Sequence, residues 1–168
     1  MYEKLLDEAK GYGITVIERY PFLSPRIRGL CCDGTIAISE QIETNAERTV
    51  VLCEELAHAL TSYGNILEDK QMERRTRERS FDRLIGIKGL LLAYLEGCRE
   101  PWEFAERFGV PHEFFDAAMQ SYRARYGTMK EITVRGKRYL LTFEPYFSVR
   151  LQRDQRENDP PAQERSAI

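Results

Sequence analysis

Apolar residues recur at helical spacing over much of this chain and alternate with polar residues only in short stretches. Residues 3–12 place Leu5, Leu6 and Ala9 on one side of a predicted helix. Residues 14–17 form a short, apolar and largely β-branched run, which favours a strand. We therefore expect the chain to open with an amphipathic helix followed by a strand.

Two pairs of short apolar runs flank glycine-containing turns. Asp33-Gly34 is typical of a two-residue hairpin turn, and Arg135-Gly136-Lys137 predicts a second hairpin. The predicted strand pairs are 28–32 with 35–38 and 132–134 with 139–143, and residues 146–151 are expected to add a strand.

A helix is predicted over residues 45–61. Thr44 and Glu47 have the spacing of a capping box at its start, and Gly64-Asn65 is the expected end. Apolar residues on several of its sides indicate a largely buried element. They are Val50, Val51, Leu56, Ala57 and Leu60.

A long helical stretch is expected next, over residues 68–97. Its first half is charged and its second half is apolar, and Gly86 and Gly89 lie inside it. Two further predicted helices each begin with a proline and end at a glycine. They cover residues 101–108 and 111–126.

Helices with a few short strands define an α+β fold. We expect residues 1–100 to form one domain, and residues 101–151 to form a helix-turn-helix-like helical hairpin with a β-hairpin. Residues 152–168 are polar and contain prolines, so they are predicted to be a disordered tail.

Composition narrows the classes of function. The net charge is −2, so DNA binding would depend on a local basic patch. No apolar run reaches the roughly 20 residues of a membrane span, and the N-terminus lacks a signal-peptide core, so we expect a cytoplasmic protein. The four cysteines form no Cys-x-x-Cys pair, which predicts reduced, mostly buried thiols rather than a disulfide framework.

The chemistry concentrates in the helix over residues 45–61. Glu54 and His58 are four residues apart on one face, and Glu55 follows Glu54, so the spacing is that of His-Glu-x-x-His with a carboxylate in place of the first imidazole. Zinc binds Glu oxygen and His nitrogen at similar distances. Glu73, at the start of the next helix, is the expected third ligand, with Glu68 or Glu78 as substitutes.

These polar residues interrupt an otherwise apolar helix, so they need partners near the core, and a metal ion is one such partner. The alternative interpretation is a solvated acidic face with one hydrogen-bonded histidine. Local sequence alone leaves both open, because Glu-Glu-x-x-His also arises by chance on charged helices.

Motifs spread over residues 28 to 150 are more specific in their order and spacing. They are Arg28-Gly29-Leu30, Asp33 to Ile38, Val51 to His58, Thr61, Gly64 to Leu67, Glu73-Arg74-Arg75, Phe104-Ala105-Glu106, Phe108-Gly109-Val110, Tyr122 to Gly127 and Phe143-Glu144-Pro145. Together they resemble the ImmA/IrrE family of zinc-peptidase-like proteins, in its phage and mobile-element branch.

The resemblance implies a mostly helical, zincin-like core with a small antiparallel sheet. It also implies a zinc-dependent endopeptidase that cleaves a helix-turn-helix repressor and so derepresses a phage or mobile element. By the same resemblance, Glu54, His58 and Glu73 are metal ligands and Glu55 is the general base. The implied cofactor is Zn²⁺, with Mn²⁺ or Fe²⁺ as alternatives.

The chain departs from the family pattern at three positions. Glu54 stands where histidine is usual, Ala57 where glycine is usual, and Arg79 where an aromatic residue is expected. In the implied mechanism the substrate lies extended along the hairpin 28–38 as an added strand.

Two other functions remain as alternatives. Residues 102–126 have the pattern of a helix-turn-helix, but the second helix begins with His112-Glu113 and carries Asp116, so we favour a structural helical hairpin over a DNA-binding unit. A catalytically inactive, metal-free protein that binds the repressor or DNA as a regulator is the other alternative.

Overall fold

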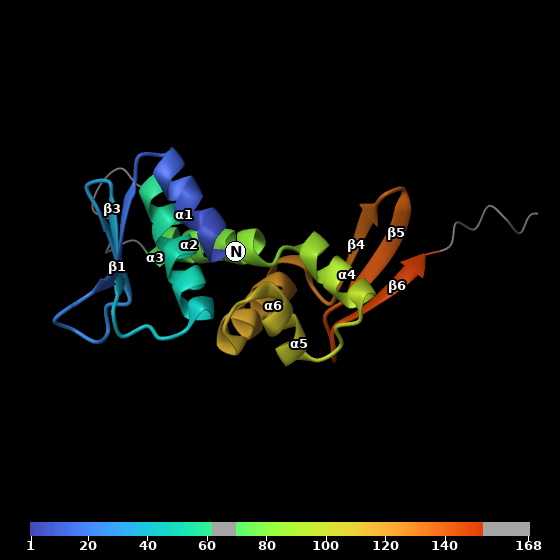
Figure 1. The fold of residues 1–168 in the computed structure, drawn as a ribbon. Coiled ribbons are helices and arrows are strands. Elements are labelled where there is room, and N and C mark those ends of the chain that lie inside the picture. The colour runs from blue at the N-terminus through green and yellow to red at the C-terminus, as the bar shows by residue number, and fades with distance from the viewer. Residues whose placement is uncertain (62–69, 153–168) are drawn as a thin grey trace, which may run out of the picture.

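A computed structural model describes residues 1–61 and 70–152 of the chain, and it shows a mixed α+β fold. The helices are α1 (Tyr2–Gly11), α2 (Asn45–Thr61), α3 (Lys70–Leu84), α4 (Ile87–Glu96), α5 (Pro101–Phe108) and α6 (His112–Tyr126). The strands are β1 (Thr15–Tyr20), β2 (Gly29–Cys32), β3 (Thr35–Ser39), β4 (Met129–Val134), β5 (Lys137–Thr142) and β6 (Ser148–Gln152). The two sheets lie at opposite ends of the molecule, with the helices between them (Figure 1).

The first sheet has the strand order β1-β3-β2, so β2 is an edge strand. The pair β2–β3 is antiparallel, whereas β1 pairs with β3 in parallel. The prediction of an antiparallel sheet was therefore wrong for β1. The loop 21–28 reverses the chain, so β2 runs opposite to β1, and β3, the hairpin partner of β2, runs in the same direction as β1.

Both predicted hairpins are confirmed. Asp33 and Gly34 have φ of 47° and 71°, the positive values that a tight two-residue hairpin turn needs at both central positions. Arg135 and Gly136 form the corresponding turn between β4 and β5. The predicted strand near residues 146–151 is β6, which pairs antiparallel with β5 and makes the second sheet three-stranded.

The hydrophobic core continues from the N-terminal elements to the C-terminal ones. Residues of α1, α2 and β3 pack in one cluster with Phe81 and Leu84 of α3, and the cluster continues into α4, α5, α6 and β5. The domain boundary near residue 100 stays a prediction. Gln152, placed in the predicted tail, is the last residue of β6, and the rest of that tail lies outside the described residues.

The predicted helix over residues 68–97 is divided into α3 and α4. The division occurs at Gly86, whose φ is 65°, and a Cβ there would lie 2.9 Å from the carbonyl oxygen of Asp82. The fully buried Tyr122 of α6 stabilises the break. Its hydroxyl donates to the Phe81 carbonyl at 2.9 Å and accepts from the Gly86 N–H at 3.1 Å.

The helices α5 and α6 form the predicted helical hairpin, and α6 packs against α3. The Phe114 ring lies 4.9 Å from that of Phe81, and Arg125 makes two hydrogen bonds to the Asp82 carboxylate. Across the described part of the chain, no helix combines the length and apolar character needed to cross a membrane.

The four cysteines are all free thiols, as predicted. Only Cys53 is fully buried, however, and Cys32 is exposed. The expectation of mostly buried thiols was wrong because successive residues of β2 point to opposite faces of an edge strand.

Candidate metal and catalytic site

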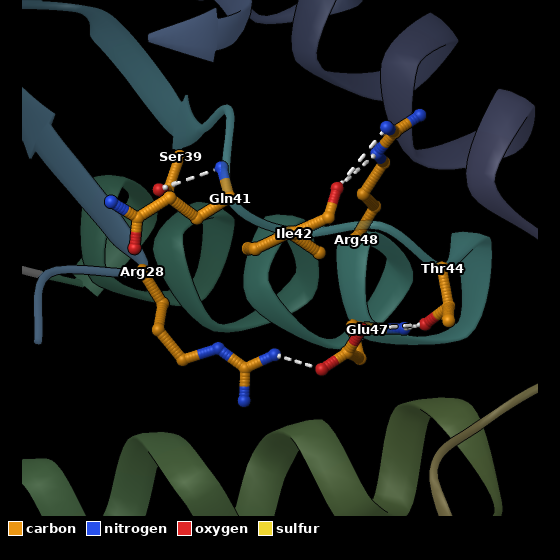
Figure 2. Close-up of polar contacts among 7 residues, drawn as sticks. All are labelled: Arg28, Ser39, Gln41, Ile42, Thr44, Glu47 and Arg48. Atoms are coloured by element: carbon orange, nitrogen blue, oxygen red, sulfur yellow. Dashed lines mark hydrogen bonds and ion pairs between the residues drawn. The ribbon is translucent and has the colours of Figure 1, made fainter. Parts of the chain in front are cut away.

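The start of α2 is held in place by several polar contacts (Figure 2). The Thr44 hydroxyl accepts from the backbone N–H of Glu47 at 3.2 Å and donates to its carboxylate at 2.8 Å, so the predicted N-terminal cap is present. Arg48 donates to the carbonyl of Ile42 at 3.1 Å. Arg28, just before β2, pairs with Glu47 at 2.8 Å. These contacts fix β2 and α2 relative to each other.

Strand β2 packs directly on the face of α2 that carries the predicted site. A Cβ built on Gly29 would lie 2.6 Å from Val51 Cγ1 and 2.9 Å from Glu55 Oε1. Only glycine fits without displacing one of the two elements. The close approach brings the Glu55 carboxylate to the strand.

Helices α2 and α3 pack in opposite directions, so residues later in α3 lie beside residues earlier in α2. His58 faces Glu73, with Nε2 3.4 Å from Oε2. Farther along α3, Ser80 lies beside the Cys53 thiol. Thr76 and Ser80 of α3 are almost fully buried, which lets the helices approach closely. Glu73 is thereby placed against the predicted site.

Burial dominates the electrostatics of the two adjacent glutamates. Burial, together with the negative charges of Glu54 and Glu73, raises the pKa of Glu55 to about 7, and the backbone N–H of Cys31 opposes the shift. Burial also raises the pKa of Glu54, and the Arg77 guanidinium opposes that shift. A buried acid that titrates near neutral pH is typical of a general base, although structural acid clusters show the same behaviour.

The outer edge of β2 is the second part of the site. The Ser39 N–H donates to the Arg28 carbonyl at 2.9 Å, and in an antiparallel pair only every second residue hydrogen-bonds the neighbouring strand. The residues that bond β3 are therefore Arg28, Leu30 and Cys32. Gly29 and Cys31 therefore direct their backbone N–H and C=O groups toward the outer edge. Glu55 stands at this edge, beside the Cys31 N–H.

The donor chemistry of the site fits a divalent cation. Two carboxylates and one imidazole are ligands that zinc accepts, and two donors on one tetrahedral zinc lie about 3.3–3.5 Å apart. The 3.4 Å between His58 and Glu73 matches that separation, and it matches a direct ion pair equally. Among residues 1–61 and 70–152, no three His, Cys, Asp or Glu side chains are grouped closely enough to hold a metal as they stand. Glu54, one turn before His58, is the ligand that would have to move.

The predicted site residues are thus partly assembled. His58 and Glu73 touch, and Glu54 and Glu55 interact electrostatically with Glu73. Of the two substitutes for the third ligand, Glu78 instead pairs with Arg74 at 3.0 Å, and residue 68 lies outside the described residues.

The roles of Gly29, Arg77 and the Cys31 N–H at this site were not predicted from the sequence. The Arg28-Gly29 motif and the spacing of four between Glu73 and Arg77 were the available signals. Neither signal shows which helix or strand faces the site.

The C-terminal helical hairpin is engaged in packing. Phe114, Phe115, Ala118 and Tyr122 of α6 are buried, and the exposed His112 lies 3.5 Å from Asp116. The preference for a structural helical hairpin over a DNA-binding unit stays a prediction. Comparison of the chain with protein-family models, with curated proteins and with solved structures gives no match.

Proposed function

We propose that this chain is a metal-dependent endopeptidase whose site lies between α2, α3 and the outer edge of β2. The contact between His58 and Glu73, which joins two predicted ligands from separate helices, carries this proposal. The burial of Glu55 beside an open strand edge supports it.

Glu54, His58 and Glu73 are the residues that would hold the cation. A Zn²⁺ ion held by these residues would lower the pKa of a water molecule and polarise the scissile carbonyl. The Glu55 carboxylate takes the proton of the attacking water as its oxygen bonds to the carbonyl carbon. Glu55 then gives that proton to the amide nitrogen as the C–N bond breaks, which yields a carboxylic acid and an amine; transfer of the acid's proton to the amine gives a carboxylate and an ammonium ion.

The edge of β2 is suited to hold an extended peptide. The outward backbone groups of Gly29 and the outward carbonyl of Cys31 can pair with a substrate strand, which would then pass beside the Glu55 carboxylate that the Cys31 N–H contacts. Such pairing recognises backbone rather than side chains. The identity of the substrate, a helix-turn-helix repressor of a phage or mobile element acting in the cytoplasm, rests on the resemblance to ImmA/IrrE proteins.

A second candidate is a metal-free protein that grips the repressor with the same edge strand. It is favoured by the absence of a ready three-donor group in the described part of the chain, and by the contact that satisfies His58 without a metal. Less than about 0.1 zinc per purified chain at neutral pH would favour this candidate.

The test uses a helix-turn-helix repressor encoded beside the gene for this chain. Zinc-loaded protein is incubated with it, and fragments are identified by mass spectrometry. We expect cleavage by the wild type and a loss of at least about 100-fold in Glu55→Gln with unchanged zinc content. Glu113→Gln, an exposed acid on α6, is the control.

Two outcomes would count against the proposal. Proteolysis retained in Glu55→Gln would remove Glu55 as the base. A wild-type protein that binds zinc and the repressor without cutting it would support the binding function instead.

A further inference from the structure

We propose that Leu30 determines substrate specificity: the row of side chains that Ile17, Ala37 and Leu30 form across the first sheet selects an apolar residue at the position of an extended peptide that lies opposite Leu30. The inference rests on the proposed function, because it uses the same outer edge of β2. It deepens that function by giving the substrate a side-chain requirement, which backbone pairing alone does not supply. No metal ligand takes part in it.

The register of the first sheet brings these three side chains into one row. Ile17 of β1 and Leu30 of β2 both pair with Ala37 of β3, one from each side. Residues paired directly across neighbouring strands point to the same face of a sheet. Gly29 marks the other face, since a Cβ there would meet Val51 of α2. The row therefore lies on the face that points away from α2.

The two ends of this row are only partly covered. Ala37 is 9% exposed, whereas Ile17 and Leu30 are 41% and 44% exposed. Within the described sheet, the middle residue has a strand on each side and each end residue has a strand on one side. A peptide strand added beyond Leu30 would cover apolar surface that now faces solvent, which favours its binding.

The edge of β2 is better suited to accept a strand than the edge of β1. The pairing of β1 with β3 shifts register between Ile17 and Tyr20, and Arg19 in this segment has a φ of 61°. An irregularity of this kind twists an edge strand and interrupts regular pairing. The pairing of β2 with β3 is regular from Gly29 to Cys32. The peptide is therefore expected to add beside β2.

The position opposite Leu30 is one at which side chains approach closely. Leu30 directs its backbone N–H and C=O toward β3, and Gly29 directs its own toward the outer edge. In an added antiparallel strand, the residue opposite Leu30 forms a non-hydrogen-bonded pair, with Cα atoms about 4.5 Å apart. Such pairs give the closest cross-strand side-chain contacts, so this position carries the strongest preference.

The surroundings of the row favour an apolar side chain over a charged one. Thr35 and Ser39 flank the middle residue of the row on the same face of β3, and both are uncharged. Arg28, at the start of the edge, pairs with Glu47 of α2 at 2.8 Å. A charged residue opposite Leu30 would lose hydration beside apolar atoms, which is costly.

The first experiment measures the binding of synthetic peptides to the metal-free protein by fluorescence polarisation. The probes are fluorescein-labelled heptapeptides Lys-Thr-Thr-X-Thr-Thr-Lys, in which X is isoleucine, phenylalanine, serine or aspartate. We expect wild type to bind the isoleucine peptide about 5–20-fold more tightly than the serine peptide. Leu30→Thr should reduce this ratio to about twofold or less, while its affinity for the serine peptide stays within about twofold of wild type.

The matched control is Leu151→Thr. It removes a similarly exposed leucine from β6, which is an edge strand of the second sheet, and it should leave the ratio unchanged. Slower hydrogen exchange of the Gly29 amide on peptide binding places the peptide at the edge of β2, because that amide points outward.

The second experiment reverses the preference. Leu30→Lys places an ammonium group at the end of the row, so this variant should bind the aspartate peptide about threefold to fivefold more tightly than the serine peptide. Wild type should bind the aspartate peptide no more tightly than the serine peptide. Because Leu30 is already partly exposed, both substitutions are compatible with folding.

Three results would overturn the inference. The first is an isoleucine preference that persists in Leu30→Thr or is lost equally in Leu151→Thr. The second is that none of the peptides binds the wild type. The third is a dimer of the peptide-free wild type that Leu30→Thr dissociates in analytical ultracentrifugation, which would assign the row to a second copy of the chain.

Failure of the proposed peptidase gives a different result. A Leu30-dependent preference for apolar peptides, without cleavage of the repressor by the zinc-loaded protein, would sink the hydrolase and keep the recognition role of Leu30. Cleavage that Leu30→Thr leaves unchanged, at sites without an apolar residue, would keep the hydrolase and remove that role.

Discussion

His58 of α2 and Glu73 of α3 meet across the interface between two helices, with Nε2 3.4 Å from Oε2. The imidazole is mostly buried, at 17% exposure, while the carboxylate is 68% exposed. A contact with one partner this exposed contributes little to stability by itself. The value of the contact lies in bringing a second helix to the face of α2 that carries Glu54 and Glu55.

Replacing Glu54 by histidine should preserve the site and tighten zinc binding. The change restores the His-Glu-x-x-His pattern and removes one negative charge from a cluster that burial and Glu73 already make costly to ionise. We expect zinc affinity equal to or above that of wild type, measured by competition with a chelating dye. His58→Ala should lose zinc. A fall in zinc occupancy in Glu54→His would contradict the ligand assignment of Glu54.

Placing a methyl group on Gly29 should separate β2 from α2. The added Cβ would lie 2.6 Å from Val51 and 2.9 Å from Glu55, so strand or helix must move. We expect Gly29→Ala to lower the free energy of unfolding by about 1–3 kcal/mol, measured by urea denaturation. Gly11→Ala is the control, because a Cβ on Gly11 would meet no atom from another part of the chain within 4 Å. Equal stability of the two variants would show that β2 does not press on α2.

The metal-free protein should lose stability as pH rises, because of Glu55. Folding raises the pKa of this acid from 4.5 to about 7, so between these values the folded state binds more protons than the unfolded chain. Stability therefore falls as pH rises through this window. Glu55→Gln should match wild type near pH 4 and exceed it at pH 8 by on the order of 1–3 kcal/mol in urea unfolding. A wild type as stable at pH 8 as Glu55→Gln would mean that Glu55 is not buried as described.

Removing the hydroxyl of Tyr122 should destabilise the junction between α3 and α4. Tyr122→Phe removes the hydroxyl's hydrogen bonds to the Phe81 carbonyl and from the Gly86 N–H. It leaves in place the bonds that the N–H groups of Ile85 and Gly86 make to the Phe81 carbonyl. Losing two hydrogen bonds at a buried hydroxyl position should lower the free energy of unfolding by about 1–3 kcal/mol, measured by urea denaturation. Tyr146→Phe, on a side chain that is 82% exposed, should have no measurable effect. A similar cost for both would remove the special role of the Tyr122 hydroxyl.

Local signals in the sequence were sufficient for most elements of the fold. The turn at Asp33-Gly34 and the cap at Thr44 each require only residues within a few positions, so both hairpins and α2 were predictable. The break at Gly86 was not predicted, because it depends on Tyr122, thirty-six positions away in the chain.

The sequence by itself determined which side chains share one face of α2, since helical spacing alone places Glu54 and His58 one turn apart. Only the tertiary structure decided what lies opposite that face. The fit of Gly29 against Glu55 and the contact of Glu73 with His58 depend on packing between elements far apart in the chain. Periodicity describes a single element, whereas burial, charge pairing and pKa depend on how separate elements pack together.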